Sequence, residues 1–155
     1  MNFLKPKFWS KRSFFSYLLL PISIFIQILS RLLTLFVKKK KFNIPIICIG
    51  NIYVGGTGKT PLAMEVATIL KINKKNPVIL KKSHKEHLDE FSLIESKKIN
   101  LIKSSSRNSG INKAINEGYN VVILDDGFQD SSIHKDLNIL CFNEKQLAGN
   151  EMTIP

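Results

Sequence analysis

The sequence has too few cysteines for a disulfide scaffold or a cysteine-rich metal centre. Its 155 residues include two, Cys48 and Cys141, and neither stands at metal-ligand spacing from a histidine. Each lies inside an apolar run typical of a strand, so we interpret both as free, buried thiols of a cytoplasmic protein. The length amounts to one domain, and 44% apolar residues are enough for a substantial core.

Acidic residues are absent from residues 1–41, which hold nine of the 23 lysines and arginines. The net charge of +11 therefore resides mainly in this segment, and the remaining residues are close to neutral. A nucleic-acid-binding protein usually spreads its basic residues over a folded face. Here they flank the most apolar part of the chain, so the composition predicts anionic membrane lipids as a partner and no nucleic acid.

An apolar run that clearly suffices to cross a bilayer is also lacking. Residues 14–30 are uncharged, but a span needs about 20 apolar residues, and this run includes Pro21 and Gln27. Basic residues flank the run on both sides, so the positive-inside rule does not determine its orientation in a membrane. No small-residue cleavage site follows the run, which argues against a cleaved signal peptide. Two interpretations stay open, and we prefer both to a buried soluble helix: a short signal anchor, or an interfacial helix with aromatic anchors at Trp9, Phe14, Phe15 and Tyr17.

Residues 42–155 alternate between two apolar patterns. Residues 62–70 and 111–118 repeat apolar side chains at helical spacing, and 90–96 predicts a short helix. Charged residues 81–89 lack a period and predict a loop. Apolar runs predict strands at 44–49, 77–80, 99–103, 119–124 and 137–142. This alternation predicts an α/β domain with a mostly parallel sheet and flanking helices, preceded by the apolar membrane helix of residues 1–41.

A glycine-rich stretch, G-N-I-Y-V-G-G-T-G-K-T-P, follows the first predicted strand. Its glycines allow successive N–H groups to point into one concavity, which binds anions together with the positive end of a following helix. Lys59 adds a cation for the phosphates and the Thr60 hydroxyl can bind Mg²⁺, as in a Walker A loop, although Tyr53 replaces that motif's first glycine. We predict that ATP with Mg²⁺ binds at Val54, Gly55, Gly56, Thr57, Gly58, Lys59, Thr60 and Pro61.

Two aspartates, Asp125 and Asp126, come directly after an apolar strand. Ligands bind at the carboxyl ends of strands in parallel sheets, and an acid there can hold Mg²⁺ or its water. Adjacent side chains point to different sides, so the two carboxylates have different roles. A lone aspartate at such a position more often caps the next turn, but the upstream G-K-T favours a metal role. The predicted metal ligands are Thr60, Asp125 and Asp126.

Together these motifs resemble the tetraacyldisaccharide 4'-kinase family, membrane-associated kinases of lipid A biosynthesis in Gram-negative bacteria. The resemblance rests on Phe8-Trp9, the apolar N-terminal segment, G-N-x-x-V-G-G-T-G-K-T-P at 50–61 and D-D-G-F-Q at 125–129. It implies a P-loop NTPase core at the cytoplasmic face of the inner membrane. It also implies transfer of the ATP γ-phosphate to the 4'-hydroxyl of a lipid A disaccharide 1-phosphate precursor, with Lys59 neutralising charge.

The resemblance further implies roles for two residues outside these motifs. Asp89, where the family has G-D-E-P, would be the base, and Arg107 would touch phosphate; on the residues alone, a solvated carboxylate and a solvated arginine are equally compatible. The chain also departs from the family. Residues 81–85 replace the family's S-R-G-Y-G, and Asp130 replaces a histidine. The three histidines, for which we predict surface positions, match no motif: His84, His87 and His134.

Residues 149–155 resemble the start of the family's loop into its C-terminal domain. We therefore expect the chain to hold the N-terminal portion of the enzyme without that domain. Three functions stay open: the lipid kinase, a nucleotide-binding portion that holds ATP without transferring phosphate, and a different membrane-associated P-loop ATPase. The third is the least favoured, because such ATPases usually carry a second lysine at the start of the loop, where this chain has Tyr53-Val54.

Overall fold

The computed structural model describes residues 20–51, 58–83, 94, 97 and 99–142. The chain divides into two compact units, one of which is Lys39–Cys141. Predicted features at other positions lie outside the described residues. These include Trp9, Phe14, Phe15 and Tyr17, the loop residues Val54, Gly55, Gly56 and Thr57, and His84, His87 and Asp89.

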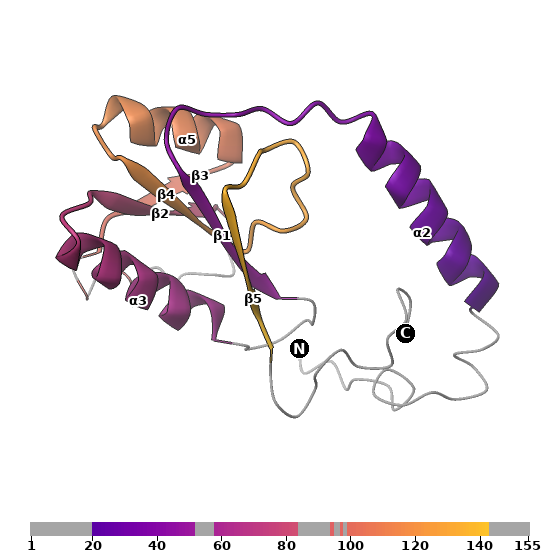
Figure 1. Cartoon of the computed structure of the whole chain (residues 1–155), viewed down its shortest axis with the longest axis horizontal. Helices are drawn as coiled ribbons and strands as arrows, with labels where there is room; N and C mark the ends of the chain where they lie inside the picture. The colour runs from indigo at the N-terminus through magenta and orange to yellow at the C-terminus, as the bar shows by residue number, and fades with distance from the viewer. Residues whose placement is uncertain (1–19, 52–57, 84–93, 95–96, 98, 143–155) are drawn as a thin grey trace. The chain divides into compact units, whose positions relative to one another are not determined.

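The unit Lys39–Cys141 is built on a five-stranded sheet (Figure 1). The strand order is β3-β2-β4-β1-β5, and all four pairings are parallel. Every residue of the central strand β4 is buried, as expected for a parallel strand covered on both faces. The strands are β1 (Ile46–Asn51), β2 (Pro77–Lys82), β3 (Leu101–Ser104), β4 (Val121–Asp125) and β5 (Leu137–Cys141). The predicted α/β fold with a parallel sheet is confirmed.

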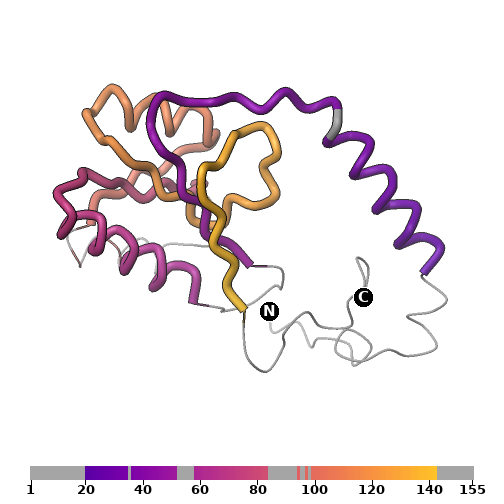
Figure 2. Tube along the Cα trace, viewed as in Figure 1, coloured from indigo at the N-terminus to yellow at the C-terminus, as the bar shows by residue number. Residues whose placement is uncertain are grey.

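Two helices, α3 (Lys59–Ile72) and α5 (Arg107–Asn116), lie on opposite sides of the sheet (Figures 1 and 2). Alternate residues of each strand face opposite ways, so the strands supply two separate cores. The α3 core contains Ile49, Ala63, Ala67, Ile79 and Ile123. The α5 core contains Ile46, Cys48, Val78, Leu80, Ile111, Ala114, Val122 and Leu124. The face on which a strand residue lies is thus fixed by its parity along the strand.

The predicted loop at 81–89 is wrong at its beginning. Lys81 and Lys82 continue strand β2 beyond the predicted end at residue 80, and Lys81 is 6% exposed. A charged residue ends an apolar run in sequence, but it can remain in a buried strand where the fold provides a counter-charge. Helix α3 begins at Lys59, directly after the glycine-rich turn as predicted, and its apolar repeat follows from Leu62. Of the predicted helix 90–96, Ile94 is described, and it is helical.

In the other unit, helix α2 covers Leu20–Leu35. Pro21 lies in its first turn, where the missing N–H costs no helical hydrogen bond. Many of its large apolar side chains are exposed, including Phe25 at 66% and Leu33 at 60%. Among the described residues, no helix combines the length and the hydrophobicity that a bilayer span requires. The predicted membrane attachment and the division between residues 41 and 42 stay predictions.

Candidate active site

The site lies at the carboxyl ends of the three central strands, where β1, β4 and β2 run side by side. Ile49 of β1 and Lys81 of β2 both pair with Asp125 of β4, so the three residues form one row across the sheet. Helix α3 begins beside this row with Lys59 and Thr60. The predicted phosphate-binding lysine and the predicted acidic strand end therefore meet at one edge of the sheet, as the parallel topology requires.

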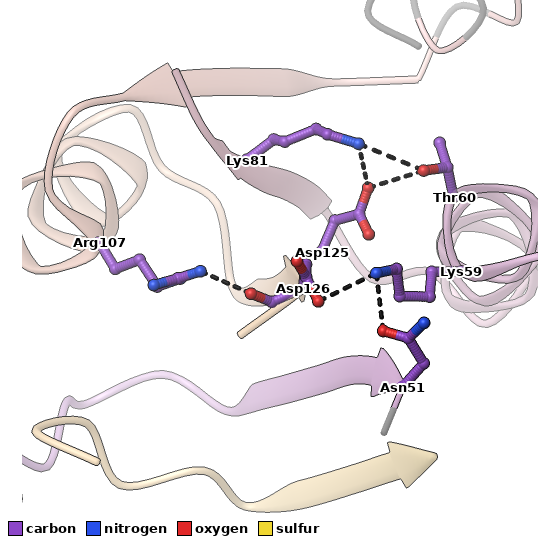
Figure 3. A network of polar contacts seen from close by, with 7 residues as sticks. All are labelled: Asn51, Lys59, Thr60, Lys81, Arg107, Asp125 and Asp126. Atoms are coloured by element: carbon purple, nitrogen blue, oxygen red, sulfur yellow. Dashed lines mark hydrogen bonds and ion pairs between the residues drawn. The ribbon is translucent and has the colours of Figure 1, made fainter. Parts of the chain in front are cut away.

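A buried polar cluster joins Lys81, Asp125 and Thr60 (Figure 3). Lys81 Nζ donates to Asp125 Oδ2 at 2.7 Å and to Thr60 Oγ1 at 3.3 Å, and Thr60 Oγ1 donates to the same carboxylate oxygen at 2.9 Å. Lys81 and Asp125 each stand two residues beyond an α3-core isoleucine of their strand, so both point to the α3 side. Their side chains are 7% and 1% exposed, and the cluster is shielded from water.

The cluster is an electrically balanced pair inside a low-dielectric core. Removing one partner of such a pair leaves an uncompensated buried charge and costs about 3–5 kcal/mol. One oxygen, Asp125 Oδ1, is buried without a hydrogen-bond partner among the described residues. Buried carboxylate oxygens normally accept a hydrogen bond, so this atom is an acceptor that Lys81 and Thr60 leave unused.

Lys59 belongs to a second and more exposed cluster. Its Nζ donates to Asn51 Oδ1 at 2.8 Å and to Asp126 Oδ1 at 3.1 Å (Figure 3). The Lys59 side chain is 21% exposed and that of Asp126 is 61% exposed. The adjacent aspartates therefore point to different sides, as predicted, and each meets its own lysine. Lys59 is held at the start of α3, ready to exchange these oxygens for those of an anion.

The turn after β4 is fixed by main-chain contacts. Asp126 adopts a positive φ of 63°, which is uncommon for a residue other than glycine. Its N–H donates to the Ile49 carbonyl at 2.8 Å, and its carbonyl accepts from Arg107 Nη2 at 2.5 Å. Arg107 Nη1 also lies 3.5 Å from Asp130 Oδ2. Arg107 thus stabilises the turn, and the phosphate contact implied by the resemblance stays a prediction.

Asp130 stands where the family that the sequence resembles has a histidine. The environment of Asp130 favours the charged carboxylate. Burial alone would raise the pKa of Asp130, but hydrogen bonds from Ser132 and the positive charge of Arg107 outweigh it and lower the pKa. The carboxylate accepts from the Ser132 hydroxyl at 2.5 Å and from its N–H at 3.1 Å. Asp130 is therefore an anion that anchors Arg107 at neutral pH.

Close packing links the two sequence motifs. A Cβ on Gly50 would lie 2.1 Å from Phe128 Cδ2, and a Cβ on Gly127 would lie 2.9 Å from Cys48 Sγ. Carbon atoms in contact are normally about 3.5–4.0 Å apart. The glycine of G-N and the phenylalanine of D-D-G-F-Q are therefore complementary: the aromatic ring occupies the space that a side chain at residue 50 would need.

Four residues of the predicted phosphate loop are described: Gly58, Lys59, Thr60 and Pro61. Gly58 precedes α3 in the left-handed conformation, with φ 78° and ψ 18°. Its carbonyl accepts the Leu62 N–H at 3.0 Å, so the helix begins directly at the G-K-T segment. This agrees with a phosphate loop that ends at a helix N-terminus, and the predicted phosphate contacts of these residues stay predictions.

The predicted metal ligands do not fit a directly bound Mg²⁺ as their side chains stand. Hydroxyl and carboxylate oxygens are suitable donors, but those of Thr60 and Asp125 both face Lys81, and Asp126 is paired with Lys59. The described residues contain no group of three histidine, cysteine or acidic residues that could hold a metal ion. The metal role of these residues stays a prediction that requires Lys81 to withdraw.

Lys81 is the site residue that reasoning from the sequence missed. A signal was present: Val78-Ile79-Leu80 and Val122-Ile123-Leu124 are the same triplet, one followed by lysine and the other by aspartate. Two buried strands with the same pattern can pair in register, which brings the charges that follow them together. The pattern became informative only once β2 and β4 were known to be neighbours, since strand β3 and helix α5 lie between them in sequence.

The sequence matches a known family over residues 15–155, described as LpxK, tetraacyldisaccharide-1-P 4'-kinase. The chain belongs to this family. It is 45% identical to a tetraacyldisaccharide 4'-kinase of Pelagibacter ubique strain HTCC1062 and 32% identical to one of Rickettsia bellii strain OSU 85-389. Both alignments cover 100% of this chain, but 49% and 53% of those proteins. The chain thus spans about half the length of the curated relatives it matches.

A solved LpxK structure has the same fold. The crystal structure of the "apo" form of LpxK from Aquifex aeolicus in complex with ATP is 34% identical, with a TM-score of 0.69. The match covers 91% of this chain and 52% of that protein. The parallel five-stranded sheet with flanking helices is therefore the P-loop-like core of this kinase family.

Proposed function

We propose that this chain binds ATP and forms the nucleotide-binding part of a tetraacyldisaccharide 4'-kinase. The reaction transfers the ATP γ-phosphate to the 4'-hydroxyl of a lipid A disaccharide 1-phosphate precursor. One observation carries the proposal: Lys59, Thr60, Asp125 and Asp126 gather where a glycine-preceded helix meets the carboxyl ends of the central strands. ATP in the structure of the Aquifex aeolicus relative supports the choice of nucleotide.

The arrangement suits phosphoryl transfer, which depends mainly on positioning and on neutralising charge. Lys59 is held by two oxygens that compete weakly with a triphosphate, because Asp126 is largely exposed. In this proposal Lys59 moves onto the β- and γ-phosphates, and the N–H groups at the start of α3 contribute further positive potential. Asp89 would accept the proton of the attacking hydroxyl; it lies outside the described residues.

The same proposal puts the protein at the cytoplasmic face of the inner membrane, where its lipid substrate resides. The basic residues of 1–41 would bind anionic lipid headgroups, and the exposed apolar side chains of α2 would enter the interface beside them. Mg²⁺ would accompany ATP, as in other P-loop enzymes. Of its predicted ligands, Thr60 and Asp125 face Lys81, and Asp126 is paired with Lys59.

ATP binding to the whole 155-residue chain tests the proposal, with Lys59→Ala as the variant. Losing a charge-assisted contact of about 1.5–3 kcal/mol should weaken binding by roughly 10- to 100-fold. Lys82→Ala is the matched control, since Lys82 is the next residue of β2 and is exposed. Equal affinity for the native chain and Lys59→Ala would refute the assignment of the phosphate site.

The chain spans about half the length of its relatives, so a second experiment separates phosphate transfer from nucleotide binding alone. Incubation with ATP, Mg²⁺ and the lipid disaccharide separates the two. A 4'-phosphorylated product identifies the kinase. Bound ATP without product, with activity appearing when the C-terminal half of the Pelagibacter ubique relative is added, identifies the binding portion.

A further inference from the structure

Lys81 stands where a nucleotide-binding loop normally keeps its divalent cation. In P-loop enzymes the hydroxyl after the loop lysine and the acid of a neighbouring strand hold Mg²⁺. Here those oxygens belong to Thr60 and Asp125, and the Lys81 ammonium bonds to both, at 3.3 and 2.7 Å. Figure 3 shows the ammonium bonded to both oxygens, which are also hydrogen bonded to each other. A positive charge therefore already occupies the position that these two residues create.

The position of Lys81 is built into the fold rather than chosen by a mobile side chain. Its backbone pairs directly with Asp125 in the register between β2 and β4. Its side chain is 7% exposed and the carboxylate 1%, so the pair is enclosed. A divalent ion entering beside an enclosed ammonium would meet a repulsive charge and a carboxylate that is already neutralised. The cluster therefore disfavours direct metal binding on both counts.

We propose that the Lys81 ammonium takes the place of the divalent cation at the Thr60–Asp125 pair. This chain then binds a triphosphate with little dependence on Mg²⁺, and its site rejects a metal ion that is not carried by the nucleotide. The nucleotide part of this inference rests on the proposed ATP site. The prediction that the nucleotide-free protein rejects a divalent ion depends only on the contacts among Lys81, Thr60 and Asp125.

The first experiment measures ATP affinity of the native chain and of Lys81→Ser, in Mg²⁺ and in EDTA at equal ionic strength. The native dissociation constant should change by less than threefold, whereas Lys81→Ser should bind at least tenfold more tightly in Mg²⁺. Lys82→Ser, altered at the next and exposed position of β2, should behave like the native chain. A tenfold Mg²⁺ dependence of the native chain would overturn the proposal even if Lys81→Ser does not fold.

The second experiment needs no nucleotide and so separates this inference from the proposed function. Without Lys81, the buried Asp125 lacks its counter-charge, and a cation at that position should stabilise the fold. Adding Mg²⁺ should therefore raise the Tm of Lys81→Ser by several degrees and leave the native chain and Lys82→Ser unchanged. A Tm of Lys81→Ser that ignores Mg²⁺, or a native Tm that rises equally, contradicts the proposal. Absence of ATP binding would refute only the proposed function.

Discussion

Gly50→Ala tests whether the two motifs of the site depend on each other through packing. Gly50 does not have a positive φ, so the backbone alone would tolerate alanine. The new Cβ, however, would lie 2.1, 2.8 and 3.0 Å from Cδ2, Cε2 and Cγ of Phe128. Because Cγ lies near the root of that side chain, the ring cannot simply rotate away and has to be displaced by more than about 1 Å to restore normal contact.

Overpacking of this kind costs about 1–3 kcal/mol. For a unit of about 100 residues, a loss of about 2 kcal/mol lowers Tm by roughly 8–16 °C. Thermal unfolding of the native chain and Gly50→Ala measures this shift.

A double-mutant cycle with Phe128→Ala decides whether the ring is the cause. With the ring removed, alanine at residue 50 has room, so the double variant should be more stable than additivity predicts by at least about 1 kcal/mol. Gly118→Ala is the control: its φ of 81° makes alanine strained, but nothing lies within 4 Å of its Cβ. The loss of stability caused by Gly118→Ala should be the same in the native background and in Phe128→Ala. Additive costs for Gly50→Ala and Phe128→Ala would refute the reasoning.

Two further predictions concern ionisable groups. Since the hydrogen bonds from Ser132 and the charge of Arg107 lower the pKa of Asp130 despite its burial, its stabilisation is present above the ordinary value of 3.8 and is lost as pH falls through the lowered pKa. Asp130→Asn should therefore cost about 1 kcal/mol at pH 7, and urea unfolding should show this difference in stability shrinking as pH falls below 3.8; an unchanged difference contradicts this. Burial raises the pKa of the Cys48 thiol. In the native protein, iodoacetamide at pH 7.5 should therefore label Cys48 more slowly than the half-buried Cys141, and Cys48 should react readily only after unfolding. Equal labelling rates would show that Cys48 is accessible.

The sheet and the location of the site could be predicted because local patterns determine them. Apolar runs of strand length recur between helical repeats, and the G-K-T and D-D segments each follow such a run. Parallel topology then brings both strand ends to one edge, whatever the order of the strands. The helix predicted to follow the glycine-rich turn begins at Lys59, and its polar residues Lys59 and Thr60 form the first turn before the apolar repeat.

Lys81 could not be placed from the sequence, because its burial depends on pairing between distant strands. A lysine after an apolar run usually marks the end of a strand, and the counter-charge that keeps it inside lies 44 residues further along the chain. The binding of Arg107 to a main-chain carbonyl was equally hidden, since a carbonyl acceptor leaves no trace in a residue pattern. Contacts of both kinds depend on the tertiary fold alone.

The buried Lys81–Asp125 pair restricts how this chain can diverge. Either residue replaced alone leaves a single charge in the core, so a lineage that loses the lysine must supply another cation at the same moment or lose stability. We expect close relatives with lysine at position 81 to keep the acid at position 125, whereas relatives with the family's serine at position 81 have to neutralise that acid with another cation. A lysine that looks like an ordinary surface residue in the sequence therefore decides which cation the core of the site contains.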